Sequence, residues 1–229
     1  MGQLESSRSE RGSRDQKKAD RPRKTEDRQT GLVRRRYERL ARIYDITQWP
    51  MERRAHRWRR DLWERLEGEN ILEVGAGTGA NIPFYGAERK MTVTDIAPKM
   101  LEQARGRAAE EGVAGTFEIA DAQNLPYPDN NFDAAVATFV FCSVPDPVQG
   151  LWELRRVVVP GGQILLLEHV LTEIPVLRFL MRLLDPLMAR LWGAHISRET
   201  VDNVRRAGFS TVSDTDLSLD IVKRVEARV

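Results

Sequence analysis

Ile71-Leu72-Glu73-Val74-Gly75-Ala76-Gly77-Thr78-Gly79-Ala80 is the stretch of this sequence that decides the fold. An apolar run ends in a turn with three glycines, which predicts a strand, a tight turn and the start of a helix. Glycine permits such a turn and lets a ligand approach the backbone closely. The spacing also fits the G-x-G-x-x-A pattern of dinucleotide sites, so this stretch alone leaves the ligand open.

Strand and helix patterns alternate from residue 70 onward. Apolar runs predict strands at 70–74, 91–95, 116–119, 133–140 and 163–168, and the segments between them predict helices at 79–85, 98–111 and 147–158. Near the end we expect a helix at 198–207 and strands at 209–215 and 218–227. Parallel strands need crossover connections, so this order predicts an α/β fold whose mostly parallel sheet is covered on both faces.

Carboxylates follow two of these strands. Asp95 ends the expected strand 91–95, twenty residues after Gly75, and Asp121 follows the expected strand 116–119. An acidic side chain at such a strand end can accept hydrogen bonds from both hydroxyls of a ribose. Ligands of open α/β sheets lie beyond the carboxyl ends of the strands. Gly75 and Asp95 therefore predict an adenosine-type nucleoside, without separating NAD from S-adenosylmethionine.

Three later motifs narrow this choice. They are Ala120-Asp121-Ala122-Gln123-Asn124-Leu125-Pro126, Asn131-Phe132-Asp133-Ala134-Ala135-Val136 and the turn Val159-Pro160-Gly161-Gly162-Gln163. With them the sequence resembles the class I S-adenosylmethionine-dependent methyltransferases, in the branch of the ubiquinone/menaquinone C-methyltransferases and bacterial phospholipid N-methyltransferases. The resemblance runs from about Tyr37 to the C-terminus. It implies a methyltransferase enzyme with a Rossmann-like, seven-stranded sheet and S-adenosyl-L-methionine as its cofactor.

The resemblance also implies which residues bind the cofactor. Glu73 and the backbone at Gly75, Ala76, Gly77 and Gly79 would face its methionine part, Asp95 the ribose, Ile96 and Met100 the adenine ring, Asp121 and the Ala122 N–H the adenine edge, and Phe139 the sulfonium. Tyr44 would belong to a lid that folds over the cofactor. Carboxylates at strand ends suit a cationic cofactor without phosphate better than a phosphate cradle does.

Methyl transfer from a sulfonium is a displacement, so the protein mainly supplies positioning and excludes water. Glu168 and His169 end the expected strand 163–168 at the ligand edge, and we name them as the catalytic candidates for proton handling. His195 is a further candidate, although a surface position suits it better. The single cysteine, Cys142, is expected to fill space in the core, and no cysteine cluster or metal site is expected.

The charge of the chain is unevenly distributed. Residues 1–60 carry 19 Lys and Arg against 9 Asp and Glu, whereas the remainder carries 17 against 25. Residues 1–30 have almost nothing to bury and predict a disordered basic tail. Residues 31–229 would form the methyltransferase domain, opening with an N-terminal helical lid at 31–67 that breaks at Trp49-Pro50. Such a basic arm is attracted to anionic lipid or nucleic acid, or serves only solubility.

An apolar helical insertion is expected at 170–195. Its core, residues 176–192, is strongly apolar, interrupted by arginines, and ends in a tryptophan. Such a segment rests in a bilayer interface, walls a pocket for an acyl or prenyl chain, or simply covers the core. The basic, tryptophan-bearing helix at 51–66 favours the membrane interpretation.

We therefore expect a lipid-like acceptor and a probable peripheral contact with an anionic membrane. Stepwise N-methylation of phosphatidylethanolamine toward phosphatidylcholine is the first hypothesis, and C-methylation of a prenylated quinone precursor is the second. A nucleic-acid- or protein-directed methyltransferase is the alternative of another class; residues 138–145 contain no Asn-Pro-Pro-Tyr-like group, which disfavours nucleic acid. With no secretory signal or membrane span, we expect a cytoplasmic protein, peripheral on the inner face of the membrane. The oligomeric state stays open.

Overall fold

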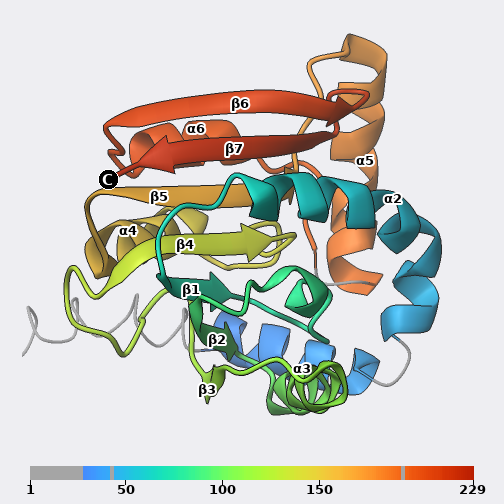
Figure 1. The fold of residues 1–229 in the computed structure, drawn as a ribbon. Coiled ribbons are helices and arrows are strands. Elements are labelled where there is room, and N and C mark those ends of the chain that lie inside the picture. Colours follow the sequence, from blue (N-terminus) through green and yellow to red (C-terminus); the bar gives the residue numbers. More distant parts are fainter. Residues whose placement is uncertain (1–27, 42–43, 192–193) are drawn as a thin grey trace, which may run out of the picture.

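A single seven-stranded sheet organises the chain in the computed structural model, which describes residues 28–41, 44–191 and 194–229, without the side chains of 44–52 and 191. The strands are β1 (Asn70–Val74), β2 (Lys90–Asp95), β3 (Thr116–Ile119), β4 (Phe132–Thr138), β5 (Val158–His169), β6 (Thr211–Ser218) and β7 (Val222–Arg228). Their order is β3-β2-β1-β4-β5-β7-β6 (Figure 1). Neighbouring strands are parallel except that β7 runs antiparallel to β5 and β6. The expected α/β fold with a mostly parallel sheet is confirmed.

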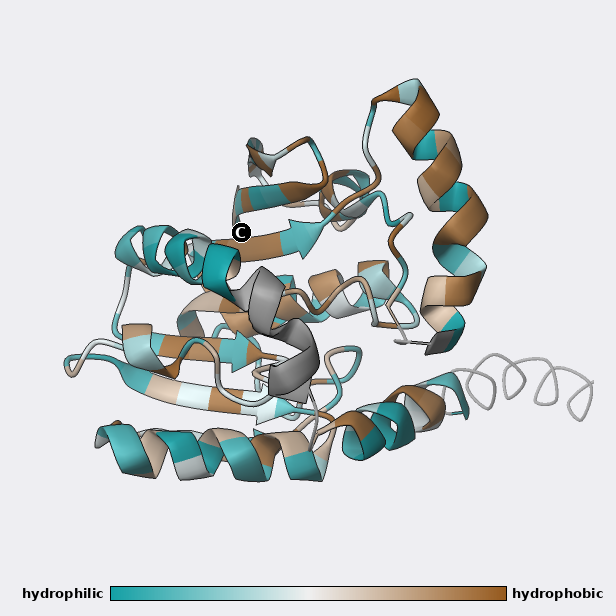
Figure 2. Ribbon diagram, turned by 90° about the vertical axis from the view of Figure 1, so that its right-hand side faces the viewer, coloured by the Kyte–Doolittle hydropathy of each residue, from teal (hydrophilic) through white to brown (hydrophobic). Residues whose placement is uncertain are grey.

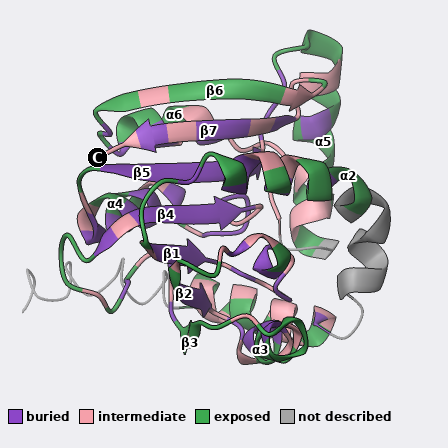
Figure 3. Cartoon of the chain, viewed as in Figure 1, coloured by how far each residue is buried: buried purple, intermediate pink, exposed green. Residues whose placement is uncertain are grey.

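Helices cover both faces of this sheet, and α5 (Pro175–Leu191) lies beyond the ends of its strands (Figure 1). The other helices are residues 28–40, α2 (Tyr44–Glu64), the short 3-10 helix η1 (Ile82–Phe84), α3 (Pro98–Glu111), α4 (Pro147–Val157) and α6 (Thr200–Arg206). Alternate residues of a strand point to opposite faces. Leu72 accordingly packs with α4 and α6, whereas Ile71 packs with α2 and α3. The central strands are therefore buried on both sides (Figure 3).

Local sequence fixes the ends of two crossover helices. Pro98 starts α3, where its missing N–H costs nothing, and Gly112 ends it with a left-handed φ of +67°. The Asp146 side chain accepts a hydrogen bond from the Gln149 N–H and caps the start of α4. Both helices begin within two residues of the expected positions, because these signals are local.

The expected helix at 79–85 is wrong. Gly79 has a φ of +86°, which a right-handed helix excludes, and Pro83 has no N–H to donate. The segment therefore forms turns and η1. The expected turn at 159–163 is instead part of β5, where the register with β4 shifts between Val158 and Gln163.

The N-terminal boundaries also differ from expectation. Of the expected tail, residues 28–30 are helical, and residues 1–27 lie outside the described residues. The predicted break at Trp49-Pro50 is absent from α2, which begins at Tyr44 and continues through Pro50 at the loss of one intrahelical hydrogen bond. The chain leaves helical geometry earlier, at Ala41.

Candidate functional site

A cavity of about 280 Å³ lies at the carboxyl ends of the parallel strands. Its wall combines the loops that follow β1, β3 and β4 with the end of β2, and it also includes side chains of residues 28–40 and of α2. The predicted cofactor residues that line it are Gly75, Ala76, Gly77, Asp95, Ile96, Met100, Asp121, Ala122 and Phe139. The topology thus gathers residues from four separate loops at one sheet edge, as expected of an open α/β sheet.

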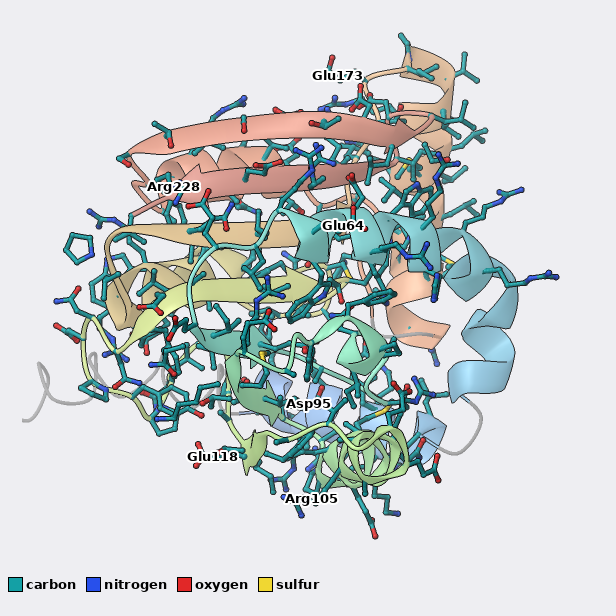
Figure 4. The ribbon with its side chains drawn as sticks, viewed as in Figure 1. Glu64, Asp95, Arg105, Glu118, Glu173 and Arg228 are labelled. Atoms are coloured by element: carbon teal, nitrogen blue, oxygen red, sulfur yellow. The ribbon has the colours of Figure 1, made fainter. Side chains whose placement is uncertain are left out.

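Asp95, labelled in Figure 4, ends β2 and links the glycine turn after β1 to the start of α3. It is 8% exposed, and its Oδ1 accepts from the Ala97 N–H at 2.8 Å while its Oδ2 accepts from the Gly77 N–H at 2.9 Å. Burial raises the pKa of Asp95, and these backbone hydrogen bonds oppose that rise. Because a carboxylate oxygen accepts more than one hydrogen bond, both oxygens keep capacity for ligand hydroxyls.

Asp121 lies on the loop after β3, next to Asp95, and is linked to residues 28–40. Its Oδ1 accepts from the Gln123 backbone N–H at 2.9 Å and from the Gln123 side-chain amide at 3.2 Å. The same amide reaches the Thr30 hydroxyl at 3.0 Å. Gln123 therefore couples a predicted cofactor residue to residues 28–40, a role that the sequence did not indicate.

The three glycines of the turn have different structural reasons. A Cβ on Gly75 would meet a Val140 methyl at 2.5 Å, so this glycine lets the loop after β4 pack against the turn. Gly77 has a φ of +58°, and a Cβ there would meet no atom within 4 Å, which leaves open space at the cavity wall. Gly79 does not line the cavity. A Cβ there would collide with Ile82 and approach Ala104 at 3.0 Å, so Gly79 serves close packing of α3 instead of ligand contact.

Glu73 lies behind the cavity wall, not on it. Its side chain is 1% exposed, and its oxygens accept hydrogen bonds from the Asn81 amide at 2.7 Å and from the Tyr85 hydroxyl. Burial raises the pKa of Glu73. Glu73 does not line the cavity in this structure, because partners from the turn and η1 hold its carboxylate in the wall, and its predicted contact with the cofactor stays a prediction. Asn81 in turn accepts from Arg59 at 2.9 Å, so Glu73 supports the cavity through Arg59.

Arg59, one of the arginines of the basic helix expected at 51–66, lines the cavity. It is 6% exposed, donates to Asn81 and to the Thr138 hydroxyl, and its guanidinium lies 5.3 Å from the centre of the Phe139 ring. A signal was present in the spacing, because Arg59 falls on the same helical stripe as the buried Ala55 and Leu62. Arg59 places a fixed positive charge on the cavity wall, suited to a carboxylate.

Residues 28–40 cover the cavity. Thr30, Val33 and Tyr37 line it, and the Tyr37 hydroxyl lies 2.6 Å from the Ser143 hydroxyl on the loop after β4. The Tyr44 side chain, predicted to belong to the lid, lies outside the described residues. Among the tyrosines whose side chains the structure describes, Tyr37 lines the cavity, and the lid itself stays a prediction.

Glu168 and His169, the predicted catalytic candidates, lie behind the loop after β4 and do not line the cavity. Glu168 Oε1 accepts from the backbone N–H groups of Val140 at 2.8 Å and Phe141 at 3.0 Å. Burial raises the pKa of Glu168 to about 7 and lowers that of His169. The His169 ring packs against Phe139, with 4.7 Å between ring centres. In this structure both residues position the Phe139 loop, since they reach the cavity only through it.

His195 connects α5 to the same loop. Its Nδ1 lies 2.8 Å from Asp185 Oδ2, and its backbone N–H donates to the Cys142 carbonyl at 2.9 Å. Its side chain is 43% exposed, which agrees with the expected surface position. Cys142 is buried, and burial raises the pKa of its thiol to about 12, which suits the expected filler.

The family profile described as "Methyltransferase domain" matches residues 72–166. A "Phosphatidylethanolamine N-methyltransferase" of Cereibacter sphaeroides is 34% identical over 139 residues, which cover 60% of this chain and 68% of that protein. The chain belongs to the class I S-adenosylmethionine-dependent methyltransferases. A "Demethylmenaquinone methyltransferase" of Clavibacter sepedonicus is 33% identical over 177 residues, which cover 69% of this methyltransferase and 72% of its relative. A "Ubiquinone/menaquinone biosynthesis C-methyltransferase UbiE" of Bdellovibrio bacteriovorus is 35% identical over 156 residues, covering 63% and 65%.

Solved structures agree with the fold of this methyltransferase. The YcgJ protein of Bacillus subtilis superposes with a TM-score of 0.58 and 25% identity over 66% of each chain. A Thermotoga maritima protein described as a "SAM-dependent methyltransferase, possible histamine N-methyltransferase" has a TM-score of 0.64 and 22% identity, covering 85% of this chain and 98% of that one. The enzyme class and the cofactor, S-adenosyl-L-methionine, follow from the family.

The cavity fits this cofactor. Asp95 and Asp121 would offer carboxylates to the ribose hydroxyls and the adenine edge, Gly77 leaves room at the turn, and the buried Arg59 would offer a partner for the methionine carboxylate. The assignment of each residue to a part of the cofactor stays a prediction.

Proposed function

We propose that this methyltransferase acts on the amino head group of phosphatidylethanolamine. The observation that carries the proposal is an exposed apolar helix, α5, beyond the carboxyl ends of the strands and tied to the cavity wall (Figure 1). A surface of this kind suits an amphiphilic acceptor better than a water-soluble one. The similarity to a phosphatidylethanolamine N-methyltransferase supports the amine as the methylated group.

The residues of the chain supply binding, orientation and exclusion of water. When bound, the cofactor supplies an electrophilic methyl group on a cationic sulfur. Asp95 would hold the ribose hydroxyls, Asp121 the adenine edge and Arg59 the methionine carboxylate, so that the methyl group faces the acceptor. Phe139 is held in a left-handed conformation, φ +59°, by its N–H bond to the Leu167 carbonyl at 2.7 Å. Such fixed positioning is the main source of catalysis in a displacement.

The covering residues would keep water out. Tyr37 and Ser143 close one side of the cavity through their 2.6 Å hydrogen bond. An amine attacks only with a free lone pair, so the acceptor nitrogen must arrive deprotonated. Because the described residues place neither Glu168 nor His169 on the cavity, we assign proton loss to solvent at the open rim.

C-methylation of a prenylated quinone precursor is the second candidate. It is favoured by the demethylmenaquinone methyltransferase, which aligns over a longer part of this chain than the phospholipid enzyme does. The apolar α5 suits a prenyl chain as well as two acyl chains. A nucleic-acid- or protein-directed activity, the alternative of another class, has no such support among the three relatives named for this chain.

Methyl-labelled cofactor decides between these acceptors. The protein is incubated in parallel with phosphatidylethanolamine vesicles, vesicles carrying a demethylated quinone precursor, and RNA. We expect label in phosphatidylethanolamine, and label found only in the quinone precursor would overturn the proposal. Asp95→Ala is the control for the site, since losing two buried hydrogen bonds to ribose costs about 2–4 kcal/mol of binding. Label transfer must fall in this variant.

A further inference from the structure

One face of α5 is apolar and exposed. Val176, Phe179, Leu183 and Leu187 are 73%, 67%, 63% and 52% exposed, and Leu180 and Leu184 are also exposed. Their spacing of three and four residues aligns these six residues, which we call the α5 stripe, along one side of the helix. Figure 2 shows the helix as a largely brown element at the edge of the molecule. A contiguous apolar surface of this size is unfavourable in water and marks an interaction site, so we infer that a partner covers the stripe.

The charges around the stripe are mixed, with an excess of positive ones. Glu199 pairs with Arg178 at 3.1 Å and Arg182 at 3.5 Å, and Glu173 is exposed just before α5. Within the described part of α5, the exposed charged residues are Arg182 and Arg190, and the one acidic residue, Asp185, is bonded to His195 and Ser197. Residues 28–40, which also lie toward the right of Figure 2, expose Arg28, Arg34, Arg35 and Arg39. Two copies of such a face would bring like charges together, which is unfavourable. An anionic lipid surface complements it.

The stripe has a fixed position relative to the cavity. Met181, 6% exposed, packs inward, and Asp185 accepts from His195 at 2.8 Å and from the Ser197 N–H at 2.9 Å. His195 donates its backbone N–H to the Cys142 carbonyl, and the next residue, Ser143, lines the cavity. A surface held by the stripe would therefore lie near the rim through which the acceptor enters.

The two tryptophans of the basic helix expected at 51–66 are not exposed for a membrane contact. Trp63 is 2% exposed and packs in the core, and Trp58 is half-buried against the same cluster. Trp192 lies outside the described residues. Among the helices that the structure describes, none has the length and apolar content to cross a bilayer.

We propose that the α5 stripe docks this methyltransferase on an anionic lipid bilayer. The helix lies in the interface with its apolar side chains among the acyl chains, while the arginine side chains reach the head groups. The inference rests on the proposed function for its purpose, since a membrane acceptor must be met at its surface. Docking itself needs no phosphatidylethanolamine, and this separates the two tests.

Vesicle co-sedimentation tests the docking surface. The vesicles contain phosphatidylcholine alone or with phosphatidylglycerol, and no phosphatidylethanolamine. The Phe179→Ser/Leu183→Ser variant removes the two central side chains of the stripe, and Leu219→Ser is the matched control, because Leu219 is 74% exposed in the turn between β6 and β7. We expect the wild type and the control to bind the anionic vesicles, and the double variant to bind at least about tenfold more weakly.

Equal binding of the double variant and the wild type, or no binding by the wild type, would overturn the proposal. A wild-type dimer that the double variant dissociates, together with no vesicle binding, would assign the stripe to a second copy instead. S-adenosylhomocysteine affinity must be unchanged in the double variant, since the stripe does not line the cavity. Vesicle binding without label transfer to phosphatidylethanolamine would refute the proposed function alone.

Discussion

Gly77 and Gly161 share a left-handed backbone and open space where a side chain would begin, but only Gly77 lines the cavity. Both Gly→Ala variants should lose about 1–2 kcal/mol of stability, because L-residues are strained at such φ values. Gly77→Ala should also weaken S-adenosylhomocysteine binding, since the methyl group occupies the space at the turn. Denaturant unfolding and calorimetry measure the two effects. Equal affinity in both variants would remove Gly77 from the binding site.

Glu168 gives the stability of the fold a pH dependence. Its pKa is about 7 in the folded protein against 4.5 ordinarily, so the folded state keeps a proton that the unfolded chain releases. The contribution of Glu168 to the free energy of unfolding therefore falls as pH rises from about 4.5 to about 7, by up to about 3 kcal/mol.

Glu168→Gln should remove this dependence, because the amide keeps an acceptor oxygen for Val140 and Phe141 but does not titrate. Urea unfolding of both proteins across this pH range gives the comparison. A variant whose stability follows the wild-type pH profile would show that another group is responsible.

At the scale of elements, the hydrogen bond between Tyr37 and Ser143 fastens residues 28–40 over the cavity. Tyr37→Phe should speed S-adenosylhomocysteine release several-fold, because one hydrogen bond is worth about 1 kcal/mol. Tyr127→Phe is the control: its hydroxyl bonds Glu118 at 2.6 Å on the exposed side of β3, outside the cavity. Stopped-flow dissociation measures both, and identical rates would mean that residues 28–40 do not act as a lid.

The elements also show where sequence patterns succeed and fail. The strands and the crossover helices α3 and α4 follow from apolar periodicity, Pro and Gly, which act within a few residues. The segment 79–85 has the length of a helix but contains Gly79 and Pro83, which exclude one. Residues 28–30 have a tail-like composition, yet they become helical beside Gln123, 93 residues away from Thr30 in the chain.

At the scale of the whole molecule, the ligand that the cavity binds should raise the free energy of unfolding. A ligand that binds only the folded protein raises the free energy of unfolding by about 2.7 kcal/mol at one hundred times its dissociation constant. S-adenosylhomocysteine should stabilise this methyltransferase accordingly, whereas NAD should not, because the family to which the chain belongs uses S-adenosyl-L-methionine. Thermal unfolding with each ligand measures this, and stabilisation by NAD alone would contradict the assignment of the cavity.

The sequence by itself determined the α/β order, the glycine turn and the carboxylates at the ends of β2 and β3, since each depends on neighbours in the chain. Only the tertiary structure decided that Glu73 is occupied by Asn81 and Tyr85, that Arg59 points into the cavity, and that Glu168 holds a loop. The physical reason is that a buried polar group must find partners, and those partners come from elements far apart in sequence. Hydrophobic periodicity indicates which side of a helix or strand is apolar, but it does not indicate which buried polar side chains form hydrogen bonds with each other.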